Sequence, residues 1–217
     1  MNLRKHNMAI ILLVRHGHND FVGKKLAGRQ PGVHLNQKGK EQVDQLAAAL
    51  SGLPIRAVFA SPLERTQETA APIARAHDLN IETLPELNEI DFGNWQGKGL
   101  ENLRKGRYWK QVQEHPADFR FPKGESFAEA QLRMVNCLMQ ISDAYAKDDL
   151  VVCVGHSDMI RLAVAHFLAM PLNDFQRLQI ETASITVLYF SGGKAHFGAI
   201  NHVLTFPENL QPADRQS

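Results

Sequence analysis

An unbroken apolar segment from Met8 to Val14, ending in Arg15-His16-Gly17, is the feature that most constrains the fold of this chain. Apolar residues without alternation are typical of a strand that is buried on both faces of a sheet. The carboxyl ends of such strands are where open α/β sheets bind their ligands. An arginine and a histidine at this end therefore mark a candidate site for chemistry.

Strand and helix patterns alternate along the rest of the chain. Strands are expected at residues 8–14, 56–60, 150–155, 184–190 and 195–201. Apolar stripes at helical spacing run from Val43 to Leu50, from Phe127 to Tyr145 and from Met159 to Phe167. Right-handed crossovers between parallel strands would place these helices on both faces of the sheet. The pattern predicts an α/β fold, namely a three-layer α/β/α sandwich with a mostly parallel central sheet.

The length of the chain favours one domain, and we expect residues 1–217 to form it. The last two strands are separated by Ser191-Gly192-Gly193-Lys194, which predicts a hairpin. Residues 97–124 form an excursion between two sheet units. Its Tyr108, Trp109 and Phe119 could supply a small core. We interpret this excursion as a lid or side lobe of the single domain.

Charge and cysteine content argue against several classes of partner. The net charge is +1 and the pI is near 7.9, so nothing favours binding to nucleic acid or to an anionic membrane. The first apolar segment is too short to span a membrane and lacks a signal-peptide cleavage pattern. Only Cys137 and Cys153 are present, without zinc-like spacing, which suits a reducing cytoplasm. We expect a cytoplasmic protein whose oligomeric state stays open, a homodimer included.

Three polar motifs each follow a predicted strand directly. They are Arg15-His16-Gly17, Ser61-Pro62-Leu63-Glu64-Arg65-Thr66 and Gly155-His156-Ser157. The second motif predicts a helix start, with Ser61 as the N-cap and Pro62 as the first helical residue. If the three strands are neighbours in a parallel sheet, the two arginines and two histidines of these motifs converge at one edge.

Two arginines, two histidines and helix N-termini around one point favour a compact polyanion, and phosphate fits best. Arginine neutralises the charge that develops in a phosphoryl transition state. One neutral imidazole can attack phosphorus as a nucleophile. A further group must protonate the leaving alkoxide, and the acidic loop from Glu86 to Gly93 is a suitable source.

These motifs resemble those of the histidine phosphatase superfamily, in its phosphoglycerate-mutase-like branch, over nearly the whole chain. The matching segments are, in order, Arg15-His16-Gly17, Ser61 through Thr69, Glu89 through Gly97, Gly124-Glu125-Ser126 and Gly155-His156-Ser157. The segment from Gly28 to Leu35 also resembles the Gly-Arg loop of the family. Five motifs in the same order make the resemblance specific.

The resemblance implies a phosphatase that hydrolyses a small phosphate monoester through a phosphohistidine on His16. It implies that Arg15, Arg65 and His156 hold the phosphoryl oxygens, with His156 also part of the catalytic set. Glu89 would be the general acid and later the base for water. Such chemistry needs no metal and no organic cofactor.

One part of the pocket departs from the family pattern. An asparagine that contacts phosphate in the family falls on Val22 here. Asn19 is the expected substitute, and Gly32 in the Gly-Arg loop is a further expected phosphate contact. The identity of the substrate does not follow from the sequence.

Three other functions stay open. A phosphomutase of the phosphoglycerate mutase type would use the same phosphohistidine and would differ in how well it excludes water. The short excursion favours the phosphatase. His16-x-His18-x-Asp20 begins a metallo-hydrolase metal site, although Phe21 stands where its last histidine belongs. A phospholigand-binding protein would keep the same residues and form no phosphoenzyme.

The excursion is rich in cations. It contains Lys98, Arg104, Lys105, Arg107 and Lys110. Most of them could lie on a solvated helix face. The sharper hypothesis is that one or two bind a carboxylate or a second phosphate of the substrate. Arg161, one turn beyond the third motif, is expected to form an ion pair.

Overall fold

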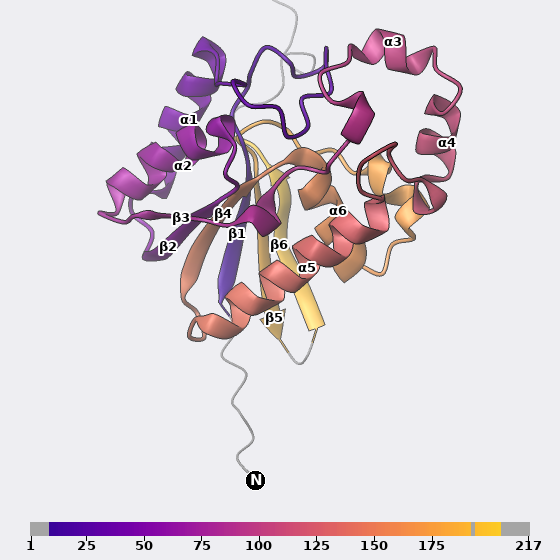
Figure 1. The fold of residues 1–217 in the computed structure, drawn as a ribbon. Helices are drawn as coiled ribbons and strands as arrows, with labels where there is room; N and C mark the ends of the chain where they lie inside the picture. Colours follow the sequence, from indigo (N-terminus) through magenta and orange to yellow (C-terminus); the bar gives the residue numbers. More distant parts are fainter. Residues whose placement is uncertain (1–8, 192–193, 205–217) are drawn as a thin grey trace, which may run out of the picture.

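The protein is built on one six-stranded sheet with helices on both faces (Figure 1). The computed structural model describes residues 9–191 and 194–204. The strands are β1 (Ile10–Arg15), β2 (Ile55–Ala60), β3 (Ile81–Thr83), β4 (Leu150–Gly155), β5 (Ile185–Ser191) and β6 (Lys194–His202). Their order is β3-β2-β4-β1-β5-β6. Strands β1 to β4 are parallel, while β5 runs antiparallel to β1 and β6 runs antiparallel to β5. The predicted α/β fold is confirmed.

Six α-helices are formed within the described residues. They are α1 (Gln37–Leu50), α2 (Glu64–Ala76), α3 (Leu100–Arg104), α4 (Trp109–Glu114), α5 (Phe127–Ala144) and α6 (Ser157–Phe167). Short 3-10 turns are η1 (Pro85–Leu87), η2 (Gly93–Trp95), η3 (Pro116–Asp118) and η4 (Leu172–Arg177). The pair α1 and α2 covers one face of the sheet, and the pair α5 and α6 covers the other (Figure 1).

The apolar run of β1 is explained by this sandwich. Leu12 and Val14 belong to the core on the α1 and α2 side, whereas Ile11 and Leu13 belong to the core on the α5 and α6 side. All four side chains are buried, because successive residues of a strand point to opposite faces. A strand between two helical layers therefore needs apolar residues at every position.

The sequence predictions miss one strand, and two predicted features fall outside the described residues. The edge strand β3 was not predicted, since its three residues are only partly buried or exposed and form no apolar run. The predicted start of the first strand at Met8 and the link at 192–193 lie outside the described residues. No described helix has the length and apolar character to cross a membrane.

The excursion is joined to the main core. It contains α3, α4 and η3, and its Phe119 and Phe121 belong to the same buried cluster as Leu13 of β1. Tyr108 contacts Phe119 with ring centroids 6.2 Å apart. The expected small core of the excursion is thus an extension of the core on the α5 and α6 side.

Candidate active site

The carboxyl ends of β2, β4 and β1 lie side by side and place the three motifs together. Arg15 is the register partner of Gly155. The His16 amide donates to the Gly155 carbonyl (3.0 Å), and the Ser61 amide donates to the Val154 carbonyl (3.1 Å). Main-chain pairing therefore continues into the first residues of the motifs, so the sheet itself sets their relative positions.

A cavity of about 520 Å³ opens at this edge of the sheet. Five of the residues predicted for the site line it: Arg15, His16, Asn19, Arg65 and Glu89. We call this space the active-site cavity. The structure thus brings together side chains that are up to 74 positions apart in the sequence (89 − 15).

His16 is buried and oriented by its own turn. Its Nδ1 lies 2.7 Å from the Gly17 carbonyl oxygen, which can only accept, so Nδ1 carries the proton. Nε2 is then the unprotonated nitrogen. Burial, together with the charges of Arg15 and Arg65, lowers the pKa of His16 well below its usual value. The ring is therefore a neutral imidazole at neutral pH, the form that a nucleophile requires.

His156 lies behind His16 and is fully buried. The two rings pack edge to face with centroids 5.4 Å apart. The Ser61 hydroxyl donates to Asn88 Oδ1 and therefore accepts from His156 Nε2, 3.0 Å away. Nδ1 faces the Arg65 guanidinium at 3.3 Å. Burial, and then the charges of Arg65, His16 and Arg15, lower the pKa of His156 well below its usual value.

The predicted N-cap role of Ser61 is wrong. Helix α2 begins at Glu64, and its N-cap is Leu63, which makes no side-chain cap bond. The hydroxyl of Ser61 is instead engaged by His156 and Asn88. The structure therefore assigns Ser61 the task of orienting the second histidine. Arg65 lies in the first turn of α2, as expected.

Both arginines present guanidinium nitrogens that have no acceptor within the described residues. Arg65 is 1% exposed and donates from Nη2 to the Gly28 carbonyl (2.7 Å), while its Nε and Nη1 are buried and unpaired. Arg15 donates from Nη1 to the Ile180 carbonyl (2.6 Å), while its buried Nε is unpaired. Leaving buried charged donors unpaired is costly, so this arrangement favours an anion.

Glu89 faces the histidines from a loop over the cavity. Its Oε2 lies 3.9 Å from His156 Nδ1, and its side chain is 12% exposed. Burial, and then the negative charge of Asp158, raise the pKa of Glu89 to about 7. The amide of Ile90 and the charges of Arg65 and Arg15 act in the opposite direction. A carboxyl group with this pKa can give and take a proton near neutral pH.

The loop that carries Glu89 is held by a network of ions that sequence reasoning missed. Glu125 contacts Arg29 Nη2 at 3.0 Å and Arg133 Nη2 at 2.9 Å. Arg29 donates from Nε to the Glu89 carbonyl (2.9 Å), and Arg133 donates to the carbonyls of Glu86 and Asn88. Glu125 and Arg29 stand in motifs that the resemblance singled out, whereas Arg133 gives no signal of its own.

Of the two remaining predicted phosphate contacts, Asn19 lines the active-site cavity and Gly32 does not. Asn19 is buried, and its Oδ1 accepts from the Phe21 amide (3.0 Å) at the wall of the active-site cavity. Val22 lines the same cavity. Gly32 does not line it, and its amide donates to Glu64 Oε1 (2.9 Å) at the surface. Asn19 is therefore near the arginines, and Gly32 is not.

The metal-site pattern is not assembled in the described part of the chain. His18 and Asp20 both contact the side-chain nitrogen of Asn36. Among residues 9–191 and 194–204, no group of three or more His, Cys, Asp or Glu could hold a metal ion.

Of the cations in the excursion, Arg104 lines the active-site cavity. Lys105 and Lys110 form exposed ion pairs with glutamates on their own helices or turns, and Arg107 stacks on Tyr108. Arg161 forms the expected ion pair, with Asp158 at 3.0 Å, and this pair also lines the cavity.

Comparison with known proteins identifies the family. Residues 11–203 match the sequence profile of the histidine phosphatase superfamily (branch 1). A 2,3-bisphosphoglycerate-dependent phosphoglycerate mutase of Thermoplasma acidophilum is 31% identical, with 83% of this chain and 87% of the relative covered. Phosphoserine phosphatase 1 of Hydrogenobacter thermophilus is 29% identical, with 84% and 87% covered. The structure of Bacillus stearothermophilus YhfR superposes with a TM-score of 0.84 at 24% identity, covering 90% of this chain and 98% of that one.

Proposed function

The chain belongs to the histidine phosphatase superfamily, and on this premise we propose that it hydrolyses a small phosphate monoester through a phosphohistidine on His16. The observation that carries the proposal is the set of unpaired, buried guanidinium nitrogens of Arg15 and Arg65 beside a neutral imidazole. The three unpaired donors belong to two side chains that line one cavity, and guanidinium donors suit the oxygens of a phosphoryl group.

The first half of the reaction transfers the phosphoryl group to the enzyme. His16 Nε2 attacks phosphorus while the bond from phosphorus to the ester oxygen breaks. Arg15 and Arg65 neutralise the charge on the phosphoryl oxygens. The ester binds as its monoanion, and the proton on its phosphoryl oxygen is shared with the unprotonated Nδ1 of His156, so this hydrogen bond needs no other proton source. Glu89 gives its proton to the leaving alkoxide, and the alcohol departs.

The second half returns the enzyme to its starting state. Glu89, now a carboxylate, accepts a proton from a water molecule as that water attacks phosphorus. The bond between phosphorus and His16 Nε2 breaks, inorganic phosphate leaves, and Glu89 is protonated again. Protons and bonds therefore balance over the cycle without another reactant.

A phosphomutase is the second candidate, favoured by the similarity to the Thermoplasma acidophilum mutase. It would form the same phosphoenzyme and pass the phosphoryl group to a second hydroxyl instead of water. A panel of phosphorylated metabolites, scored for released phosphate and for isomerised product, separates the two reactions. Release of phosphate without isomer supports the phosphatase, and isomer formation supports the mutase.

The phosphohistidine is tested by rapid quenching with a ³²P-labelled ester. The wild-type protein should carry an acid-labile, alkali-stable label, and His16→Ala should lose both the label and turnover. His18→Ala is the matched control, because His18 lies two residues away and contacts Asn36 rather than the cavity. Labelling that persists in a folded His16→Ala protein would contradict the proposal.

A further inference from the structure

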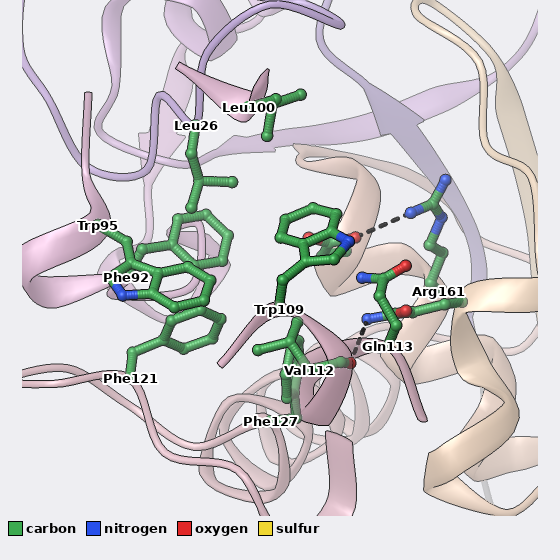
Figure 2. A pocket seen from close by; sticks show the side chains of 12 residues that line it. Leu26, Phe92, Trp95, Leu100, Trp109, Val112, Gln113, Phe121, Phe127 and Arg161 are labelled. Atoms are coloured by element: carbon green, nitrogen blue, oxygen red, sulfur yellow. Dashed lines mark hydrogen bonds and ion pairs between the residues drawn. The ribbon is translucent and has the colours of Figure 1, made fainter. Parts of the chain in front are cut away.

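A second pocket of about 300 Å³ adjoins the active-site cavity, and its walls are mainly apolar (Figure 2). Phe92, Trp95 and Phe121 lie on one side of it, and Trp109 and Val112 of α4 lie on the other. We call it the apolar pocket. None of these side chains has a part in the reaction steps described above.

The apolar pocket and the active-site cavity share part of their walls. Five residues line both spaces: Leu26, Phe92, Leu100, Asp158 and Arg161. The two charged residues among them form an ion pair, in which Arg161 Nη1 donates to Asp158 Oδ1 at 3.0 Å. The alcohol part of a substrate with its phosphate at His16 would pass this pair, whose Arg161 Nε is buried and has no acceptor within the described residues, before it reaches the apolar walls.

The walls of the apolar pocket are anchored before any ligand enters. Gln176 of η4 donates from Nε2 to the Val112 carbonyl (3.1 Å), which ties α4 to the body of the protein. The Trp95 and Phe121 rings pack edge to face with centroids 5.4 Å apart. The Leu26 carbonyl accepts from the Gly97 amide (2.7 Å). A pocket formed in advance selects ligands by shape at little ordering cost.

We propose that the apolar pocket holds an alkyl or aryl group of the substrate's alcohol, so that the substrates are phosphate monoesters of alcohols with an extended apolar part. This inference rests on the proposed function, because it assumes that the phosphate end lies at His16. A sugar phosphate in the same pose would bring hydroxyl groups against the apolar side chains that form most of the lining. The polar side chains that line the pocket are Gln113, Gln176, Asp158 and Arg161, so hydroxyl groups away from these four would stay unsatisfied. An apolar chain gains free energy there for each buried methylene.

The experiment uses a series of primary n-alkyl phosphates from ethyl to octyl. Beyond the shortest members, their leaving groups are chemically alike, so differences in kcat/KM report binding of the chain rather than chemistry. We expect kcat/KM to rise about two- to fourfold per methylene until the pocket is filled, the upper figure corresponding to ~0.8 kcal/mol per CH₂. A flat profile with ethyl phosphate still hydrolysed would overturn the inference and leave the proposed function standing.

Two variants locate the effect in the pocket. Trp109→Ala should lower kcat/KM for octyl phosphate about tenfold more than for ethyl phosphate, because it removes most of one wall. Leu100→Ala gives the same test if the first variant fails to fold. Tyr108→Ala is the matched control, since this neighbouring aromatic side chain is exposed and does not line the pocket. An unchanged chain-length profile in both folded wall variants would overturn the inference.

A binding measurement separates this inference from the reaction. Calorimetry with n-alkyl phosphonates, which are not hydrolysed, should show affinity rising with chain length and an increasingly negative heat-capacity change. If no ester is turned over but this trend is present, the proposed function fails and the pocket assignment holds. If esters are turned over and the trend is absent, the pocket assignment fails alone.

Discussion

The floor and the wall of the active-site cavity are held in place by different means. The floor consists of Arg15 and His16 at the end of β1, with the buried His156 packed against His16 after the end of β4, and main-chain pairing positions all three. The wall carries Glu89 on a loop that is held by side-chain ion pairs to Glu125. The sheet therefore positions the residues of the floor, whereas a few side chains position the residues of the wall.

This difference separates two kinds of function. Residues of the floor meet the phosphoryl group, which every substrate shares, so changes there should affect all substrates alike. Residues of the wall meet the leaving group, so changes there should depend on which alcohol leaves. The following predictions test that separation.

Among these predictions, the largest effect is expected from Arg65→Lys, because Arg65 meets the phosphoryl group as the floor residues do. An ammonium group cannot reproduce the two unpaired guanidinium donors, so kcat/KM should fall about 10³-fold for alkyl and p-nitrophenyl phosphates alike. Steady-state kinetics with circular dichroism as a check on folding measure this. Arg75→Lys, exposed at the other end of α2, should change nothing. A loss confined to alkyl esters would contradict the separation between residues that meet the phosphoryl group and residues that meet the leaving group.

Glu89→Gln should lower kcat about 10²- to 10³-fold for ethyl phosphate and much less for p-nitrophenyl phosphate, whose leaving group needs no acid. The wild-type kcat/KM should fall above pH 7, because the acid form of Glu89 is lost as pH rises through its pKa of about 7. The variant should lack this alkaline limb. Glu86→Gln in the same acidic segment is the control, and equal losses for both esters would remove Glu89 from its role.

Glu125→Gln should act through Glu89 and cost about tenfold for ethyl phosphate, because a displaced acid meets the leaving oxygen poorly. The loss should again be small for p-nitrophenyl phosphate, and the alkaline limb should move, which a general loss of structure would not produce. Glu125→Asp should recover part of the activity. Glu129→Gln, in the first turn of the following helix α5 and paired with Arg120, is the control.

The smallest effect is expected from Arg104→Ala, on the excursion. This exposed cation lines the cavity, so its loss should raise KM about two- to fivefold for esters that carry a carboxylate and leave neutral alkyl esters unchanged. Lys105→Ala, whose partner is Glu101, is the matched control. Unchanged KM values for every anionic ester would show that Arg104 is only a surface charge.

The floor was predictable from the sequence because its signals are local. A buried parallel strand needs a continuous apolar run, and Arg15, His16 and His156 stand directly after two such runs. The short edge strand β3 has no such run and was missed. Ser61 was read as a helix cap because its part in the site depends on a ring 95 positions away.

The wall was less predictable because its contacts join separate elements. Arg29 comes from a loop, Glu125 from a turn and Arg133 from the middle of α5, and no spacing links the three. Glu89 stood among several acidic residues, and only the resemblance to a family selected it. Side-chain networks of this kind become visible once the elements are placed in space.

The position of β1 in the sheet bears on how the protein is made. This first strand lies between β4 and β5, whose residues begin at Leu150 and Ile185. During synthesis at about 5–20 residues per second, both edges of an apolar strand stay without their final partners for roughly ten seconds or more. Such distant pairing slows folding, and it makes the nascent chain a natural client for chaperones until its last hairpin emerges from the ribosome.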